Sequence, residues 1–312
     1  MENNLDYEEV LMAKTAWYYY SDNLTQQQIS DLLGVNRMRV IKLLDKAKQC
    51  GIIQFKIRSD SEKRMEIEQL LMKQFGLKDC FIVPSPMAVE DINENIAKAA
   101  SMYICNRLTD ESFINVGYGD TSSRILNHLA ISTEHTLSCV SLTGGVSYYL
   151  PNANSSTFNS RLYLIPTPLL ASTNEMAAAM KTEKSVKDIE QLIPLSCLSV
   201  IGIGSMDDEA TILKSGILTK NDFLFLTRNG AVGDVLSHFI NEDGEIVKSG
   251  LEDRTISTPL ETLKKLDNVI GVAAGENKVT AIRAALHGKY LDILITDEDT
   301  ANALVSGENV SL

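Results

Sequence analysis

Four short glycine-rich segments carry residue types that suit the binding of a phosphate group. They are "GYGDT" (117–121), "TGG" (143–145), "GIGS" (202–205) and "AGENK" (274–278), and the last of them ends in Lys278. Each follows an apolar run that predicts a strand. Glycine lets backbone N–H groups approach an anion, and a helix that begins after the loop adds a favourable dipole. A tight turn would explain any one loop, but the four together predict a site for a small phosphorylated ligand.

The segment "GAVGDVL" (230–236) adds a carboxylate to this prediction. Asp234 follows Gly233 and precedes another run of helical spacing. A carboxylate in that position can accept hydrogen bonds from the hydroxyl groups of a sugar-like ligand. The alternative is that Asp234 caps a helix N-terminus and touches no ligand.

The same loops would also suit an enzyme that moves a proton on a sugar phosphate. Such an isomerase needs a positioned base, and the acidic candidates are Asp120, Asp234 and Glu276. The four histidines fall outside the glycine loops, in predicted helices or polar turns, and we expect them at the surface. They are His128, His135, His238 and His287.

The N-terminal segment has a charge balance unlike that of the rest of the chain. The 312 residues carry a formal net charge of −12. Residues 1–58 contain eight Lys/Arg and seven Asp/Glu, and the remainder contains 21 and 34, so the two parts carry +1 and −13. Within 37–58, seven basic residues accompany one acid, Asp45. An acidic body with one basic patch favours contact with nucleic acid at that patch.

The elements around this basic patch match a helix-turn-helix. A helix is predicted over 7–20, and Thr25 with Gln28 forms a capping-box pattern for a second helix. Gly34 suits the left-handed residue that ends the second helix, and Asn36 suits the cap of a third. Two helices joined by a tight glycine turn are typical of DNA-binding proteins, although a helical hairpin with a basic face is the alternative.

The front of the third helix carries the residues expected to reach DNA. In a helix-turn-helix the first residues of the second helix of the motif contact base edges, and arginine there suits guanine or a phosphate. The expected contacts to double-stranded operator DNA are Thr25, Gln26, Asn36, Arg37, Arg39 and Lys42.

Two further patterns follow the basic patch. "IIQFKIRS" (52–59) alternates apolar and polar residues, which predicts the strand of a small wing. "SDSEKRMEIEQLLMKQFGL" (59–77) has apolar residues at helical spacing, which predicts a connecting helix or an oligomer contact. We therefore expect a winged helix-turn-helix domain over 1–58 and a second domain over 59–312.

From Asp79 onward, short apolar runs alternate with segments of helical spacing. Runs such as "CFIVPS", "SFINVGYGDT" and "CLSVIGIGS" predict strands. This alternation predicts an α/β domain with a doubly wound, Rossmann-like parallel sheet. In such sheets ligands bind beyond the carboxyl ends of the strands, where the glycine loops fall.

Composition narrows the class of protein further. No apolar run approaches the roughly 18 residues that a membrane span needs, and "MENNLDYEEV" lacks the pattern of a signal peptide. We therefore expect a cytoplasmic protein with no membrane partner. Five scattered cysteines without Cys-x-x-Cys pairs predict reduced, mostly buried thiols and no metal site. They are Cys50, Cys80, Cys105, Cys139 and Cys197.

Several longer segments resemble the SorC family of bacterial transcriptional regulators. "AWYYYSDNLTQQQISDLLGVNRMRVIKLLDKAKQCGII" is similar to their DNA-binding head, and "LTGGV", "VIGIGS", "GAVGDVL" and "GVAAGENKVTAIRAAL" are similar to their effector domain. The motifs keep their order over nearly the whole chain. The resemblance implies a repressor that assembles as a homotetramer, an effector domain akin to sugar-phosphate isomerases, and neither catalysis nor a cofactor.

The resemblance also implies which residues bind the effector. The expected contacts are Gly117, Tyr118, Thr143, Gly144, Gly145, Asp234, Leu236 and Lys278. Members of the family respond to sugar phosphates, and some respond to phosphorylated autoinducer-2, a short phospho-polyol of quorum sensing. We expect phosphorylated autoinducer-2 here, with another sugar phosphate as the alternative. A purely architectural role on DNA would leave the large acidic domain unexplained.

Overall fold

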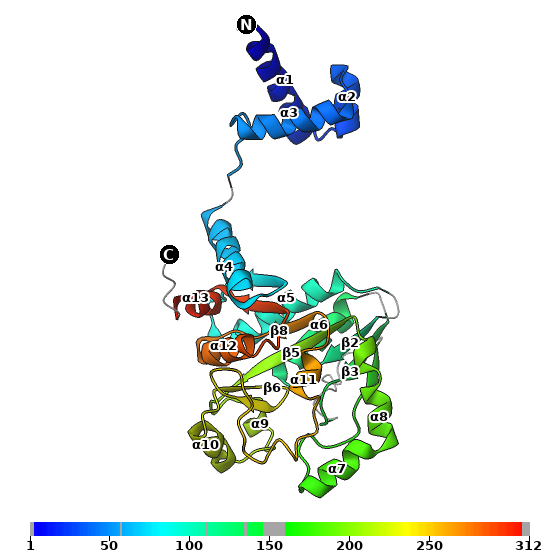
Figure 1. The fold of residues 1–312 in the computed structure, drawn as a ribbon, viewed down its shortest axis with the longest axis vertical. Helices are drawn as coiled ribbons and strands as arrows, with labels where there is room; N and C mark the ends of the chain where they lie inside the picture. The colour runs from blue at the N-terminus through cyan, green and yellow to red at the C-terminus, as the bar shows by residue number, and fades with distance from the viewer. Residues whose placement is uncertain (1–2, 57, 110–111, 134–135, 146–159, 308–312) are drawn as a thin grey trace. The chain divides into compact units, whose positions relative to one another are not determined.

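The computed structural model of the chain describes residues 3–56, 58–109, 112–133, 136–145 and 160–307. The chain divides into two compact units, Met1–Glu62 and Lys63–Leu312, whose elements are labelled in Figure 1. Each unit has its own apolar core.

The described residues of the N-terminal unit form three helices and the start of a fourth. They are α1 (Asn3–Tyr20), α2 (Gln26–Leu33), α3 (Arg37–Gln49) and α4 (Ser59–Phe75). The predicted capping box is confirmed, because the Thr25 side chain accepts from the Gln28 N–H and the Gln28 side chain accepts from the Thr25 N–H. Gly34 has a φ of 64°, which ends α2 in a left-handed turn, and Asn36 caps α3.

Two apolar clusters hold these helices together. One joins Met12 of α1 to Leu43 of α3, and the other joins Ile29 of α2 to Val40 and Leu44 of α3. The buried face of α3 therefore holds the three helices together. Because α3 packs against α1 and α2 with this one face, its polar face stays accessible.

The wing strand predicted over 52–59 is wrong. Residues 52–56 and 58 form no strand, and Ser59 is the first residue of α4. Ile52 and Ile53 both pack against the cluster of α1 and α3, and the Ile53 N–H donates to the Ala47 carbonyl at 3.1 Å. Neighbouring side chains of a strand point to opposite faces, so two consecutive packed isoleucines favour a turn against the helix end. Phe55 is 65% exposed and meets the Tyr20 ring edge-on.

The second unit is built on a sheet whose described strands include seven parallel ones in the order β1-β9-β8-β5-β2-β3-β4. A short antiparallel hairpin, β6-β7, extends from β5. The strands are β1 (Asp79–Val83), β2 (Phe113–Val116), β3 (Leu137–Ser141), β4 (Ser160–Tyr163), β5 (Leu198–Ser205), β6 (Gly233–Val235), β7 (His238–Ile240), β8 (Val269–Val272) and β9 (Ile293–Asp297). The predicted α/β class with a parallel, Rossmann-like sheet is confirmed.

Helices cover both faces of this sheet. Helices α5 and α6 pack on one face, and α4, α12 and α13 pack on the other, as the arrangement in Figure 1 shows. The α-helices of this unit after α4 are α5 (Ile92–Cys105), α6 (Asp120–Ser132), α7 (Asn174–Thr182), α8 (Lys184–Glu190), α9 (Thr211–Lys214), α10 (Lys220–Arg228), α11 (Leu260–Leu263), α12 (Val279–His287) and α13 (Glu298–Ser306). The 3₁₀ turns among the described residues are η1 (Val89–Asp91), directly before α5, η3 (Ile193–Leu195) and η4 (Glu276–Lys278).

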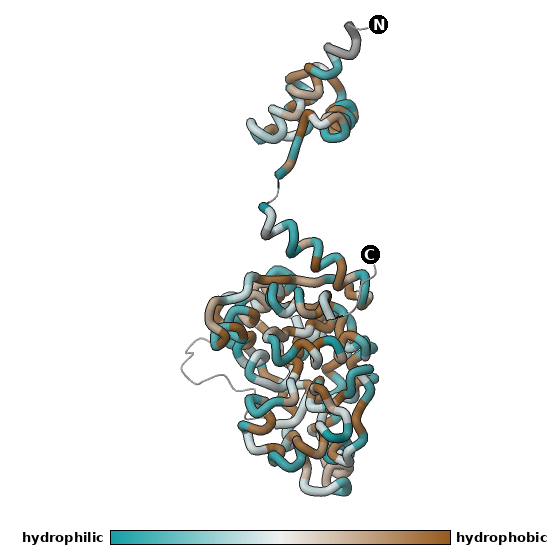
Figure 2. Tube along the Cα trace, turned by 90° about the vertical axis from the view of Figure 1, so that its left-hand side faces the viewer, coloured by the Kyte–Doolittle hydropathy of each residue, from teal (hydrophilic) through white to brown (hydrophobic). Residues whose placement is uncertain are grey.

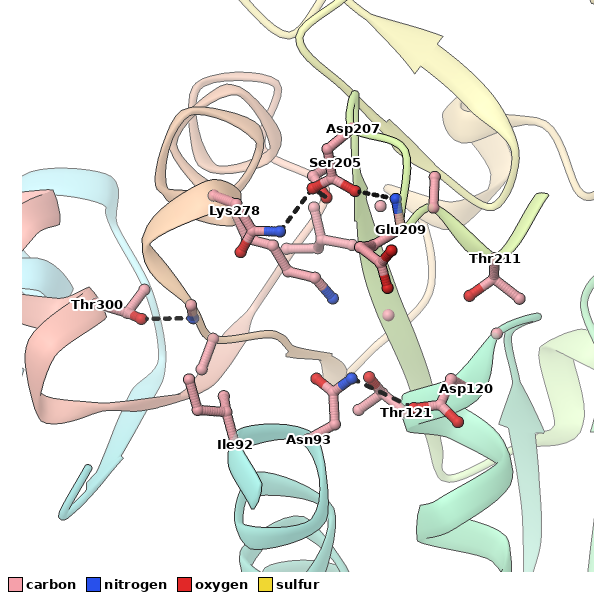
Figure 3. Close-up of a pocket in the computed structure, with 18 of the residues that line it drawn as sticks. Ile92, Asn93, Asp120, Thr121, Ser205, Asp207, Glu209, Thr211, Lys278 and Thr300 are labelled. Carbon is pink, nitrogen blue, oxygen red and sulfur yellow. Dashed lines mark hydrogen bonds between the residues drawn. The ribbon is translucent and has the colours of Figure 1, made fainter. Parts of the chain in front are cut away.

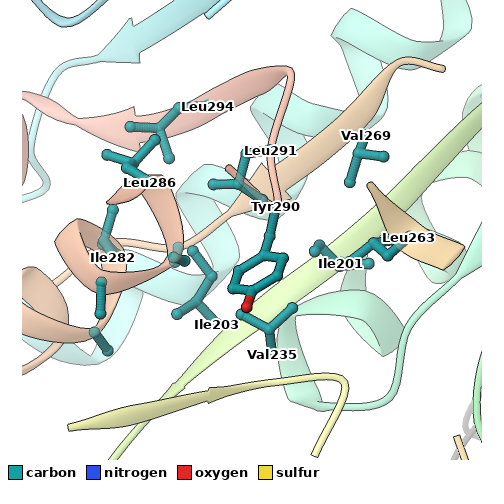
Figure 4. Close-up of a cluster of buried hydrophobic side chains, with 14 of the residues drawn as sticks. Ile201, Ile203, Val235, Leu263, Val269, Ile282, Leu286, Tyr290, Leu291 and Leu294 are labelled. Atoms are coloured by element: carbon teal, nitrogen blue, oxygen red, sulfur yellow. The ribbon is translucent and has the colours of Figure 1, made fainter. Parts of the chain in front are cut away.

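Alternate strand residues supply two separate cores. Ile201 and Ile203 of β5 pack with α12 in the core drawn in Figure 4, whereas Val200 packs with α5 and α6. A sheet covered on both faces needs strands that are apolar on both faces, which explains the short continuous apolar runs of the sequence. Hydrophilic and hydrophobic residues mix along α4 in Figure 2, and Leu71 of α4 is fully buried in the α12 core.

The structure bears on the expectations of buried thiols and of no membrane-spanning segment. All five cysteines are free; Cys80 and Cys139 are buried and Cys105 is half-buried. Cys50 and Cys197 are exposed, so the expectation of buried thiols holds for part of the set. Among the helices described, none is long and apolar enough to cross a membrane.

Candidate functional site

A cavity of about 1210 Å³ opens at the carboxyl ends of the central parallel strands. The segments that follow β2, β5, β8 and β9 line it, together with the β6 hairpin and the start of α5 (Figure 3). Three of the four glycine loops, "GYGDT", "GIGS" and "AGENK", contribute to this lining. The cavity therefore lies where a parallel sheet places its ligand.

Lys278 supplies a positive charge to this cavity. It is the last residue of η4, directly before α12, and its side chain reaches into the cavity in Figure 3. Burial lowers the pKa of Lys278, and the carboxylates of Asp234, Asp207 and Asp120 act in the opposite direction. In the described part of the chain, Lys278 forms no ion pair. A partly desolvated ammonium without a direct partner favours the binding of an anion.

The other two cations of the lining are already paired. The Arg124 guanidinium donates to Asp120 at 2.8 Å and to Glu94 at 2.7 Å. Lys214 pairs with Glu209. Among the described lining residues, Lys278 is thus the cation that can pair with an anionic group of a ligand.

Asp234 lies in the middle of β6, between β5 and β7. The helical run predicted after it is wrong, and so is the reading of Asp234 as a helix cap. The chain instead reverses at Leu236 and Ser237, whose φ angles are 53° and 63°, and enters β7. Two consecutive positive φ angles give a two-residue hairpin turn that matches the twist of the flanking strands. The Ser237 N–H donates to Asp234 Oδ2 at 2.9 Å and fixes the carboxylate.

The Asp234 carboxylate is suited to accept hydrogen bonds. Burial raises its pKa to about 6, although the Ser237 N–H and the charge of Lys278 act in the opposite direction. A carboxylate that has lost much of its hydration gains strongly from new hydrogen-bond donors. The hydroxyl groups of a ligand would supply such donors.

A polar network ties the Lys278 segment to the end of β5. Asp207 Oδ2 accepts from Ser205 Oγ and from Asn277 Nδ2, both at 2.6 Å, and Oδ1 accepts from the Glu209 N–H at 2.8 Å. Burial opposes the ionisation of Asp207, but these hydrogen bonds outweigh it and lower its pKa. The Asp207 carboxylate therefore joins two glycine loops that are far apart in sequence.

Three helices begin at the cavity. The first residues of α6 and α13 and the η4 turn before α12 all contribute to the lining. The Gly275 N–H donates to Thr300 Oγ1 at 2.8 Å, which joins η4 to α13. Helix N-termini carry partial positive charge, so this end of the sheet favours an anionic group.

The structure brings half of the expected effector contacts to the cavity. Tyr118, Asp234, Leu236 and Lys278 line it. Gly117 lies directly behind Leu236, because a Cβ at Gly117 would sit 3.0 Å from Leu236 Cδ2.

The "TGG" loop does not belong to the lining of this cavity. The N–H groups of Gly144 and Gly145 donate to the carbonyls of Ile256 and Thr167 at 2.9 and 2.8 Å, and Thr143 Oγ1 donates to the Gly144 carbonyl. Thr143 also forms an antiparallel bridge with Ser257, whose hydroxyl donates to the Leu236 carbonyl. The loop thus connects to the wall of the cavity through the β6-β7 turn.

Sequence reasoning missed several polar residues of the lining. Asp207, Asn277 and Thr300 join its loops, and Asn93 donates to Asp120 at 3.2 Å. A usable signal existed for Thr300, since "TDEDT" follows the last apolar run of the sheet. Asn93 gave no signal, because it stands at the start of a helix that precedes β2.

The acidic candidates for a catalytic base and the histidines lie in different surroundings. Asp120 is held by Arg124 and Asn93, and Glu276 is exposed. His238 contradicts the expected surface position: it is buried in β7, where its Nε2 lies 3.1 Å from the Thr258 carbonyl and burial lowers its pKa. On helices, His287 is exposed and His128 half-buried. His135 lies outside the described residues.

The expected DNA contacts gather on α2, the following turn and α3. All are exposed except Gln26, which is half-buried. The set consists of Thr25, Gln26, Asn36, Arg37, Arg39 and Lys42. Arg37 Nε donates to Gln26 Oε1 at 3.3 Å, and Arg39 pairs with Glu8 of α1 at 2.8 Å. The arginines therefore lie at the exposed start of α3.

Comparisons with known proteins agree with this architecture. Residues 59–306 match the family described as "Putative sugar-binding domain". The chain is 35% identical over 304 residues to the transcriptional regulator LsrR of Klebsiella pneumoniae, covering 96% of this chain and 94% of that protein. It is 36% identical over 303 residues to LsrR of Escherichia coli K12, covering 96% and 95%. The chain belongs to the SorC family of transcriptional regulators.

Two solved structures of regulators show the same fold. The full-length sorbitol operon regulator SorC of Klebsiella pneumoniae is 25% identical, with a TM-score of 0.67, and the match covers 95% of this chain and 98% of that chain. A domain described as that of "a possible sugar-binding transcriptional regulator" from Arthrobacter aurescens is 26% identical, with a TM-score of 0.66, and the match covers 77% of this chain and 97% of that chain. These relatives are named as regulators, in line with the expectation that the chain is not an enzyme.

Proposed function

We propose that this SorC-family regulator represses transcription by binding operator DNA through α2 and α3. A small phosphorylated polyol in the cavity of the second unit releases the DNA. Phosphorylated autoinducer-2 is the effector we propose, on the strength of the similarity to LsrR over nearly the full chain. Another sugar phosphate is the alternative, because the matched family is described only as sugar-binding.

The position of Lys278 carries this proposal. Its ammonium extends into the cavity at the start of α12, and the other described lining cations are already paired. A phosphate there would receive a charge-assisted hydrogen bond from Lys278 together with the favourable end of the helix.

The carboxylates of the lining support a polyol as the rest of the ligand. Asp120, Asp207, Asp234 and Asp297 all contribute to the cavity. Hydroxyl groups can donate to these oxygens, whereas a second anionic group would be repelled. The ligand would therefore lie with its phosphate at Lys278 and its hydroxyl groups toward Asp234. Tyr118 and Leu236 would form the wall, with Gly117 and the segment Thr143–Gly145 behind them.

We further infer that the protein acts in the cytoplasm as a homo-oligomer, a tetramer by analogy with the family. A single helix-turn-helix makes few contacts with DNA, and such proteins gain affinity by occupying two half-sites about 34 Å apart. A pseudo-palindromic operator follows from this. Tight binding of one half-site by a monomeric full-length chain would contradict it.

A ligand screen by thermal unfolding tests the effector class. The full-length protein is heated with phosphorylated autoinducer-2, unphosphorylated autoinducer-2, ribose 5-phosphate or inorganic phosphate. A true effector at 100 times its Kd should stabilise the fold by about 2.7 kcal/mol. Stabilisation by a phosphorylated polyol and not by its unphosphorylated form supports the proposal. Equal stabilisation by both forms would contradict the role of Lys278.

A further inference from the structure

One face of α3 presents a row of three cations, and Glu8 of α1 pairs with two of them. Lys42 and Lys46 stand three and seven positions after Arg39, which places the three side chains on the same side of the helix. Together with Glu8, Asp45 and Gln49, they line a groove of about 220 Å³. The groove lies wholly within the N-terminal unit.

The Glu8 carboxylate divides its two oxygens between two cations. Oε1 accepts from Arg39 Nη2 at 2.8 Å, and Oε2 accepts from Lys46 Nζ at 3.0 Å. The hydrogen bond and charge of Lys46, followed by Arg39, lower the pKa of Glu8. Two oxygens of one anion bound by a guanidinium and an ammonium reproduce the contacts that two non-bridging phosphate oxygens would make.

We propose that Arg39 and Lys46 form a binding site for a backbone phosphate of DNA, and that Glu8 occupies this site in the free protein. The proposal rests on the proposed role of α3 in DNA binding. A phosphate that enters the site displaces Glu8, so part of the electrostatic gain is lost in breaking the two ion pairs. A phosphate contact is independent of base sequence, so Glu8 weakens binding to any duplex and lowers non-specific occupancy.

Removal of the Glu8 charge tests the proposal on DNA of mixed sequence. The full-length protein is titrated onto a labelled duplex of about 30 base pairs, at several salt concentrations. Glu9 is the matched control, since it is the next residue of α1, is exposed and forms no ion pair in the described chain. Glu8→Gln should tighten binding by about three- to tenfold, and Glu9→Gln by less than about twofold. The plot of log K against log salt should become steeper by up to about one unit in Glu8→Gln.

A second pair of variants keeps the test independent of how Glu8→Gln folds. In the wild-type background, Lys46→Met should flatten the salt slope by up to about one unit, whereas Lys48→Met, at an exposed position of α3, should change it far less. Equal effects of Glu8→Gln and Glu9→Gln, or weaker binding by Glu8→Gln with α1–α3 intact by circular dichroism, would overturn the phosphate site. A wild-type protein that binds no duplex even at low salt would overturn the proposed DNA-binding role of α3 as well.

Discussion

Asn277 donates a 2.6 Å hydrogen bond from Nδ2 to Asp207 Oδ2, and this contact joins the segment that carries Lys278 to the end of β5. Ser205 Oγ and the Glu209 N–H complete the set of donors around the same carboxylate. The Lys278 ammonium is therefore positioned by contacts that other residues make. Lys278 itself forms no ion pair with any described residue, which leaves its charge for a ligand.

Substitution of Asp207 should weaken effector binding without touching the ligand's phosphate contact. Asp207→Asn replaces one acceptor oxygen with an N–H₂ group that faces other donors, so the Lys278 segment loses its anchor. We expect a loss of about 1–2 kcal/mol, or roughly 5- to 30-fold in Kd by calorimetry. The adjacent Asp208 is exposed and lies 3.8 Å from Lys220, so Asp208→Asn is the control and should bind normally. An Asp207→Asn protein with wild-type affinity would show that the network does not position Lys278.

Two glycines of β5 form a matched pair for testing the role of Asp234. A Cβ at Gly204 would collide with Asp234 Oδ1, whereas a Cβ at Gly202 would meet nothing within 4 Å. Gly204→Ala should displace the carboxylate and weaken effector binding at least about tenfold, the cost of roughly one good hydrogen bond. Gly202→Ala should change affinity little, although Gly202 also lines the cavity. Comparable effector affinities of the two variants in a ligand titration would show that Asp234 does not contribute to binding.

The sequence predicts the N-terminal unit and the sheet better than the site. The Thr25 capping box, Gly34 and the Asn36 cap act locally, so their effect can be predicted from neighbouring residues. The hairpin after Asp234 could not be predicted in this way. Leu236 and Ser237 occupy positive φ angles that glycine normally provides, and the packing of Leu236 against Gly117 and the Ser257 hydrogen bond hold them there.

The carboxylate network of the cavity could not be predicted from the sequence either. Asp207 and Asn277 are 70 positions apart, and nothing local indicates that they meet. The prediction of a wing strand was wrong for a related reason. Alternation of apolar residues in 52–59 predicts a strand, but Ile53 packs against the helix pair beside Ile52. Tertiary packing decided the structure in both places.

The half-buried Asp234 should make stability depend on pH. Its pKa rises from 3.8 to about 6 on folding, so between these values the folded state binds the proton more tightly than the unfolded state. Stability therefore falls as the pH rises through this window, and the penalty is complete above about pH 6. Asp234→Asn should stabilise the ligand-free protein by about 1–2 kcal/mol at pH 8 and by almost nothing below pH 4, as measured by chemical denaturation. A stabilisation that does not change between the two pH values would contradict the pKa shift.

Each arginine at the start of α3 should contribute to operator affinity. Arg37→Ala and Arg39→Ala should each cost roughly 1–3 kcal/mol if the guanidinium reads guanine, with relaxed specificity at one base pair. A phosphate contact, as proposed above for Arg39, would instead weaken all sequences alike and flatten the salt dependence. Lys14→Ala, at an exposed position of α1, controls for the lost charge. Unchanged affinity of both arginine variants for a duplex selected from random sequence would show that α3 does not contact DNA.

The most direct test of the account is release of operator DNA by a phosphorylated effector in wild type and in Lys278→Ala. Full-length protein is bound to a fluorescent operator duplex, and anisotropy is followed as phosphorylated autoinducer-2, or the sugar phosphate found by the ligand screen, is added. Lys220→Ala, at an exposed lysine, is the control. An effector shifts the DNA-binding equilibrium only by its differential affinity for the two states. Loss of a charge-assisted contact to a desolvated phosphate costs about 2–5 kcal/mol, or some 30- to several-thousand-fold in affinity. We predict that Lys278→Ala binds operator normally and stays bound at effector concentrations that release wild type and Lys220→Ala. Release of all three proteins at the same effector concentration would contradict the assignment of the cavity.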